Sequence, residues 1–184
     1  MRAAFYRWVW IASGVALLGA SPAGADSGKV SGTLIVNGTK VPVKHIMAVT
    51  YDTPSPGRLI SAMVSDKPVD PKMFAEYTRI GPGEKYVAGM VTGAWVTLHA
   101  EDKVLSGFTF TLDKDNRVIL DEVLVGKTRE DNFGILEDYL VVEVTSTTPR
   151  LVGRIRTKEP VIELNTEKVG LDLTFDVPVA PLGK

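Results

Sequence analysis

The chain has 184 residues, a formal net charge of −1 from 21 basic and 22 acidic side chains, and no cysteine. The absence of cysteine excludes disulfides, thiol catalysis, thiolate metal sites and the lipid attachment of a bacterial lipoprotein. Charges of both signs are interspersed without a basic stripe, so nucleic acid is not an expected partner.

The first 25 residues have the three parts of a secretory signal peptide. Arg2 and Arg7 form a positive segment, Trp8 to Ala20 is an apolar run, and small residues follow up to Ala25. We predict cleavage after Ala25 and a secreted or periplasmic location. The apolar run is shorter than the roughly 20 residues that span a bilayer, which makes an uncleaved anchor the weaker alternative, and no transmembrane segment is expected after cleavage.

The predicted mature chain, residues 26–184, opens with a β-hairpin. Two runs of alternating apolar residues over Lys29 to Val49 flank an Asn-Gly pair at 37–38, which is the strongest short-range hairpin signal. His45 shares the phase of Val43 and Met47, so we expect it to point into the core or to lie at the end of the sheet.

Further elements follow in chain order. Arg58 to Ser65 has a strand-like pattern, and Asp70 followed by Pro71 predicts one short helix near residues 70–79. Thr128 to Glu137 is expected to be a loop or a single helical turn. Further strand-like segments follow at Tyr86–Val91, Ala94–Glu101, Val104–Leu112, Arg117–Val125, Asp138–Val144, Leu151–Arg156, Val161–Leu164 and Lys168–Val179.

Nine or ten short strands, with turns every 8–12 residues or so, predict an all-β fold. We expect mainly an antiparallel β-sandwich that forms a single domain over residues 26–184. A small outer-membrane-associated β-barrel is an alternative. It requires strands of about 9–11 residues with aromatic girdles, whereas several strands here are shorter and aromatic residues make up 8% of the chain.

The candidate binding residues are Trp95, Thr97, His99 and Glu101, which share one face if Ala94 to Glu101 is a strand. Exposed on that face, they would suit a small ligand or a protein partner. The alternative is that the predicted helix covers this face and Trp95 packs beneath it. If the binding role holds, Trp95→Ala leaves folding intact and abolishes capture of the partner.

Other sites receive less support from the residue pattern. A zinc site of His45, His99 and Glu101 requires two sheets to bring opposite faces together. The acidic turn at 113–116 could hold calcium, but it lacks the glycine and the distal glutamate of a hand-type loop, and turn chemistry accounts for its residues. No nucleophile elbow, phosphate loop or dinucleotide fingerprint is present. We therefore predict no catalytic residue, metal or cofactor.

Three segments carry a resemblance. They are the V-x-G-x-L-x-V-N-G-x-x-V-x-V-x-H pattern that begins at Val30, the strand that closes in Ser65 to Pro68, and the Leu151 to Ile155 run before the last strand. Together they resemble uncharacterised secreted bacterial proteins of β-sandwich type. The resemblance implies the compartment and the architecture, and it carries over no catalytic residue.

Two hypotheses of function follow. The first is a secreted or periplasmic, non-enzymatic β-sandwich that binds a protein partner or a small ligand. The second is an enzyme of unfamiliar design that uses His99 and Glu101. A concave pocket that joins these two side chains would favour the enzyme.

Overall fold

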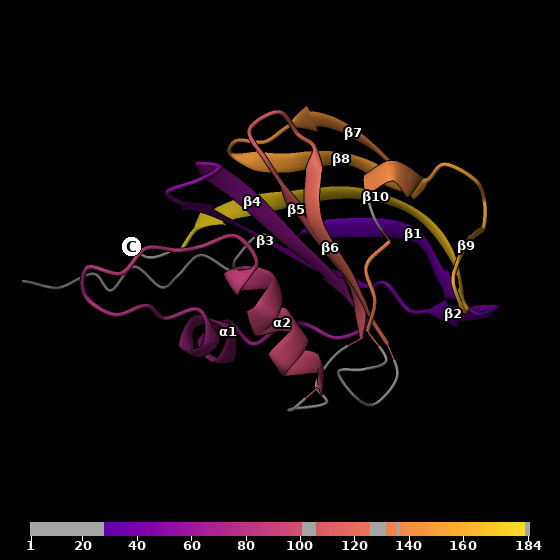
Figure 1. Ribbon diagram of the computed structural model, residues 1–184, viewed down its shortest axis with the longest axis horizontal. Coiled ribbons are helices and arrows are strands. Elements are labelled where there is room, and N and C mark those ends of the chain that lie inside the picture. Colours follow the sequence, from indigo (N-terminus) through magenta and orange to yellow (C-terminus); the bar gives the residue numbers. More distant parts are fainter. Residues whose placement is uncertain (1–27, 101–105, 126–131, 136, 183–184) are drawn as a thin grey trace, which may run out of the picture.

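The computed structural model describes residues 28–100, 106–125, 132–135 and 137–182. It confirms the predicted all-β class, since ten strands form a mixed sheet and two α-helices pack together on one side of it (Figure 1). The predicted signal peptide and its cleavage site lie outside the described residues.

The strands are β1 (Lys29–Val36), β2 (Thr39–Val41), β3 (His45–Asp52), β4 (Arg58–Ser65), β5 (Gly107–Leu112), β6 (Val118–Leu124), β7 (Leu140–Ser146), β8 (Arg150–Thr157), β9 (Ile162–Leu164) and β10 (Glu167–Pro181). The helices are α1 (Pro71–Tyr77), α2 (Met90–Ala100) and a short 3-10 turn, η2 (Glu137–Tyr139).

The last strand, β10, joins the two halves of the sheet. It pairs with β1 along one edge and with β9 and β8 along the other, all antiparallel. Its final residues leave β1 and pair in parallel with β3, with Val179 opposite Ala48. The sheet order is therefore β2-β1-β10-β3-β4-β5-β6, with β7 attached through β8.

One apolar core lies between the two halves. It is built from alternate side chains of nearly every strand, as the period of two in a strand requires. Phe110 of β5 contacts Phe175 of β10 with ring centroids 5.5 Å apart, which ties the β3–β6 half to the half built on β10. The alternating apolar residues of β10 that the sequence places in one phase, Val169, Leu171, Leu173, Phe175 and Val177, are all buried in this core.

The opening hairpin is shorter than predicted. The turn at 37–38 is confirmed, with φ of 49° and 77° at its two residues, but the returning strand β2 ends at Val41. The chain then crosses to begin β3 at His45, which pairs with β4 and β10 rather than with β1.

The short helix is confirmed as α1, and its sequence explains where it begins. The Asp70 carboxylate accepts a hydrogen bond from the Lys72 backbone N–H at 2.8 Å, and Pro71 occupies the first helical turn. Thr78 ends the helix, and its buried hydroxyl donates to the Phe74 carbonyl oxygen at 2.8 Å. The Asp70 carboxylate thus satisfies a backbone N–H that the start of a helix leaves unpaired, and the Phe74 carbonyl oxygen accepts from both the hydroxyl and the backbone N–H of Thr78.

The strands predicted at Tyr86–Val91 and Ala94–Glu101 are wrong, because helix α2 occupies Met90–Ala100. The apolar residues of this segment fit the helical repeat as well as the alternation of a strand. Val91, Ala94, Trp95 and Leu98 have the spacing of one helical face, and all four are buried. This face packs on the outer side of the β3–β6 half, so contact with the sheet overrides the strand preference of valine and threonine.

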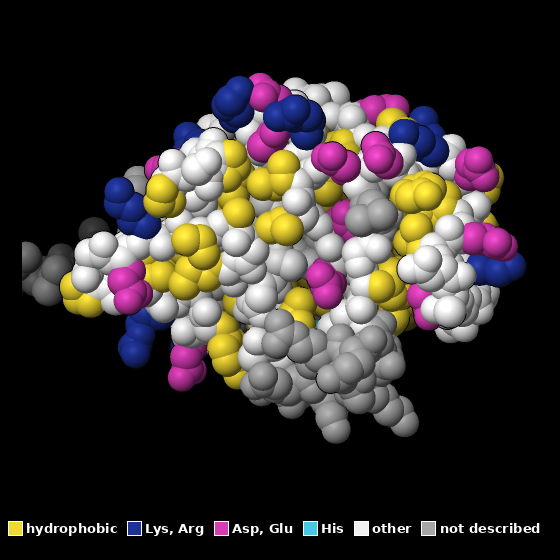
Figure 2. Space-filling view, viewed as in Figure 1, with side chains coloured by type: hydrophobic (Ala, Val, Ile, Leu, Met, Phe, Trp, Pro, Cys, Tyr) yellow, Lys and Arg dark blue, Asp and Glu magenta, His cyan; other side chains and the backbone are white. Residues whose placement is uncertain are grey.

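No helix among the described residues is long and apolar enough to span a membrane. On the face shown in Figure 2, acidic and basic side chains lie side by side along the edge formed by β7 and β8. Opposite charges also pair between strands, as Arg154 does with Asp172 between β8 and β10 at 2.6 Å. This face therefore presents no extended surface of a single charge.

Candidate functional site

Trp95 and Thr97, two of the residues predicted to share a binding face, do not share one. On a helix, positions two apart point in very different directions, so α2 separates Trp95 from Thr97. Trp95 is fully buried and stacks on Phe74 of α1, with ring centroids 5.3 Å apart. The arrangement matches the alternative in which the helix covers this face and Trp95 packs beneath it.

Thr97 and His99 also lie elsewhere than on the predicted exposed strand face. Thr97 donates its hydroxyl within α2 to the Gly93 carbonyl oxygen at 3.0 Å. His99 is 4% exposed, and its Nε2 lies 3.1 Å from the Val125 carbonyl oxygen, which corrects the expectation of a surface histidine. Glu101 lies outside the described residues. His99 therefore helps to hold α2 against the end of β6.

The environment of His45 differs from the one that the sequence predicts. It is half-buried, in phase with Met47 as expected, but this phase faces the helix layer rather than the core between the two halves. His45 lines a hollow of about 390 Å³, here called the His45 hollow, at the seam between β3 and the end of β10. Six of its apolar lining residues are Met47, Ala48, Val69, Pro71, Val177 and Ala180.

A second hollow of about 460 Å³, here called the Arg79 hollow, adjoins the first. The two share Met47, Pro71 and Ala180, and we call them together the groove. One face of α1 forms a wall, because Pro71, Phe74, Ala75 and Thr78 have helical spacing. Val49, Ile80, Tyr86 and Leu182 complete most of the remaining lining.

Few of the described groups that line the groove are polar, and none of these is a carboxylate. No described aspartate or glutamate lines either hollow, whereas His45 lies in one and Arg79 in the other. The hydroxyls of Ser65 and Thr78 are already donated to the carbonyl oxygens of Lys67 and Phe74. The charge balance of the lining residues therefore favours an anion over a cation.

Tyr86 adds a neutral polar group to the Arg79 hollow. Its ring meets that of Tyr51 edge-on, with centroids 5.6 Å apart. Burial raises the pKa of Tyr86 above its ordinary value, so its phenol stays protonated at neutral pH. Tyr86 consequently brings an O–H donor to an otherwise apolar wall.

A cluster of buried hydroxyls lies beneath α2, on the outer face of the β3–β6 half. Ser61 Oγ is 3.0 Å from the Tyr51 hydroxyl and 2.7 Å from Thr111 Oγ1, and Thr92 of α2 lies 3.4 Å from Thr111. Nucleophilic catalysis by serine needs an adjacent general base, and the partners of Ser61 here are hydroxyls. The cluster therefore joins α2 to the sheet.

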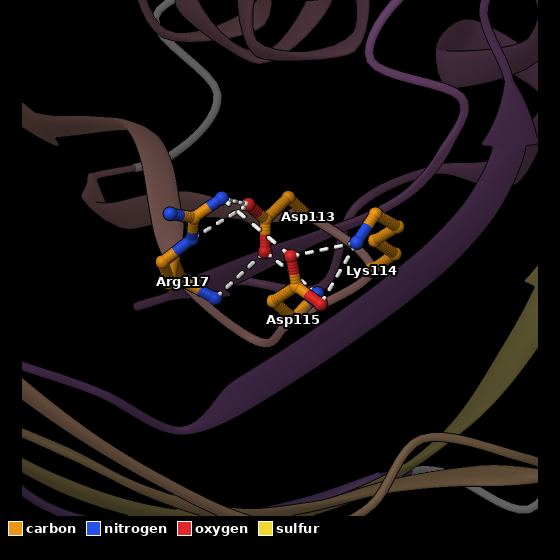
Figure 3. A network of polar contacts seen from close by, with 4 residues as sticks. All are labelled: Asp113, Lys114, Asp115 and Arg117. Atoms are coloured by element: carbon orange, nitrogen blue, oxygen red, sulfur yellow. Dashed lines mark hydrogen bonds and ion pairs between the residues drawn. The ribbon is translucent and has the colours of Figure 1, made fainter.

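The acidic turn between β5 and β6 is closed by its own arginine (Figure 3). The buried Asp113 carboxylate accepts hydrogen bonds from the backbone N–H groups of Asp115 and Arg117 and from the Arg117 guanidinium, at 2.8 to 3.0 Å. The Asp113 oxygens are thus engaged by donors, and the Asp115 carboxylate accepts from the Lys114 ammonium. Among the described residues, no group of three or more histidine, aspartate or glutamate side chains is arranged to hold a metal.

Asp113 gives a testable pH dependence. Burial raises the pKa of Asp113, but the hydrogen bonds from Arg117 and Asp115 outweigh burial and hold the pKa below its ordinary 3.8. The carboxylate therefore stabilises the fold above that ordinary value, and this stabilisation is lost as the pH falls through the lowered pKa. We expect Asp113→Asn to cost about 1–2 kcal/mol of unfolding free energy at pH 7.

The measurement is urea unfolding of both proteins from pH 7 to about pH 2. The difference between them should shrink toward the acid end. Asp115→Asn is the matched control, because this carboxylate of the same turn is half-exposed and its loss should cost less than about 0.5 kcal/mol. An Asp113→Asn deficit that stays constant with pH would contradict the assignment.

A third hollow, of about 370 Å³, lies between the β5–β6 turn and η2. Arg117 and Lys158 line it together with Glu137 and Asp138. Since both signs are present in equal number, its charges favour no particular class of ligand.

No protein-family model, curated protein or solved structure matches the chain. The groove is the feature that residue patterns missed, because its lining comes from the β4–α1 connection and from strands far apart in the sequence. The one local feature of the groove visible in the sequence is the segment from Pro68 to Pro71. It predicts a loop and the start of a helix, but it does not predict which strands these elements pack against.

Proposed function

We propose that the chain is an exported, non-enzymatic binding protein that holds a small apolar ligand in the groove. The observation that carries this proposal is the pair of adjoining hollows, of about 390 and 460 Å³, with a mostly apolar lining. Pockets for small molecules usually have volumes of about 300–1,000 Å³, mainly apolar walls and a few polar groups. The groove has this composition.

The shape of the groove suits an elongated ligand. It follows β3 from His45 to Val49, a distance of about 13 Å at the rise of an extended strand. The end of β10 forms one wall with Val177 and Ala180, and α1 forms the other with Pro71 and Ala75. A chain-like molecule could therefore lie along both hollows.

Export and the absence of catalysis rest on the sequence. Residues 1–25 have the charge, apolar run and small-residue site of a cleaved signal peptide. The chain contains no recognised catalytic motif. A periplasmic or secreted carrier of an apolar molecule is consistent with both observations.

Ala180→Trp tests the proposal, because Ala180 is exposed and lines both hollows. An indole at this position should fill the groove without disturbing the core. We expect the mature protein to bind Nile red, a neutral apolar dye, with enhanced fluorescence, and the variant to bind it about tenfold more weakly or worse, which corresponds to about 1.4 kcal/mol.

Two further variants make the result specific. Ala75→Trp narrows only the Arg79 hollow and should weaken binding less than Ala180→Trp. Ala88→Trp places the same side chain at an exposed site that lines neither hollow and should bind as wild type does. Equal binding by all of these proteins, or no uptake of the dye by wild type, would refute the proposal.

A further inference from the structure

We infer that the ligand of the groove is a single-chain fatty carboxylate whose head group binds the Arg79 guanidinium. This inference rests on the proposed function, because it names the ligand of the same groove. The inference rests on the charges of the lining residues and on the absence of an ion pair between Arg79 and any described residue.

Arg79 is one of three described arginines, with Arg58 and Arg156, that form no ion pair with a described residue. Arg117, Arg150 and Arg154 each form an ion pair with an aspartate. Arg79 forms no ion pair with any described residue, yet it lines an apolar hollow. The nearby Glu84 carboxylate is held instead by the Gly81 backbone N–H at 2.7 Å. An unpaired guanidinium beside apolar walls favours a bound anion.

The position of Arg79 is set by the end of α1. Its backbone N–H donates to the Glu76 carbonyl oxygen at 3.3 Å, directly after the cap at Thr78. Arg79, an exposed residue, lines the Arg79 hollow together with Phe74, Ile80 and the rest of the apolar wall. A molecule whose apolar chain lies in the groove and whose charged head group lies at this end would bury apolar surface and also pair its charge with Arg79.

A carboxylate fits this site better than other head groups. One guanidinium matches one planar carboxylate through two parallel hydrogen bonds. A phosphate would carry more charge than a single arginine balances, and no second arginine or lysine of the described part of the chain lines either hollow. An ammonium head group would lie beside Arg79 at one end of the groove or beside His45 at the other, and no described carboxylate of the lining would pair with it.

The test compares ligands with one chain and three head groups: dodecanoate, dodecanol and dodecylamine, each displacing Nile red from the mature protein below its micelle concentration. We expect dodecanoate to bind about tenfold more tightly than dodecanol, since hydrogen bonds between charged groups are among the strongest, and dodecylamine to bind most weakly. Arg79→Gln should reduce dodecanoate to the affinity of dodecanol and leave dodecanol unchanged.

Lys72→Gln is the matched control. It removes a positive charge from the same helix at an exposed residue that lines neither hollow, so the preference for carboxylate should survive. Equal binding of all three ligands by wild type would overturn the inference and leave the proposed function standing. Loss of the preference in His45→Gln instead of Arg79→Gln would also overturn it. Failure of Nile red and dodecanol to bind would refute the proposed function itself.

Discussion

Trp95→Ala is expected to lower the free energy of unfolding by about 3–5 kcal/mol, the usual cost of deleting a large buried aromatic side chain. Trp95 has no exposed surface and stacks on Phe74 at an interplanar angle of 17°. Its removal would leave a cavity between α1 and α2 and withdraw support from Phe74, which lines the Arg79 hollow. The sequence predicts that Trp95→Ala leaves folding intact. The packing of Trp95 predicts instead that this substitution destabilises the fold.

Urea unfolding followed by circular dichroism measures this effect. Val87→Ala is the control, because Val87 is 56% exposed and its truncation should change stability by less than about 0.5 kcal/mol. Trp95→Phe should cost less than the alanine variant, since it keeps an aromatic ring and removes an indole N–H that has no hydrogen-bond partner among the described residues. A Trp95→Ala protein as stable as wild type would contradict the observed packing.

Gly32→Ala is expected to cost about 3 kcal/mol or more, because two constraints act at one residue. Gly32 has φ of 128°, a conformation that side chains disfavour. A Cβ atom would also lie 1.9 Å from the Asp172 backbone oxygen. Since Gly32 lies opposite Leu173, relief of the clash would require β1 to move away from β10.

Gly38→Ala separates these two constraints. Gly38 in the hairpin turn also has positive φ, 77°, but no atom lies within 4 Å of the position of a Cβ. Its substitution should cost only the backbone strain, about 1–2 kcal/mol. If Gly32→Ala unfolds at the same urea concentration as Gly38→Ala, this result would contradict the close approach of β1 and β10 at Gly32.

Much of the fold could be predicted because its signals are local. The Asn-Gly turn at 37–38, the N-cap at Asp70 and the alternation of β10 each depend on a few neighbouring residues. Strand β4 has the predicted bounds, Arg58–Ser65. Helix α2 was mistaken for strand because its apolar residues fit two periods at once, and only the sheet beneath it decides between them.

The candidate site could not be predicted in the same way. The phase of His45 with Met47 was correct, but both faces of β3 are covered, one by the core and one by the helix layer. Alternation alone does not distinguish two buried faces. Trp95 and His99 would share an exposed face only if residues 94–101 formed a strand with one face in solvent, and helix α2 removes that condition.

By itself, the sequence determined the all-β class, the positions of most strands and turns, and the start of α1, because spacing and turn chemistry act over a few residues. The tertiary structure decided which face of each strand is covered, that residues 90–100 form a helix, and that His45 and Arg79 line one groove. That groove exists because β10 ends in parallel pairing with β3. Such pairing depends on the packing of segments far apart in the chain, which no local pattern records.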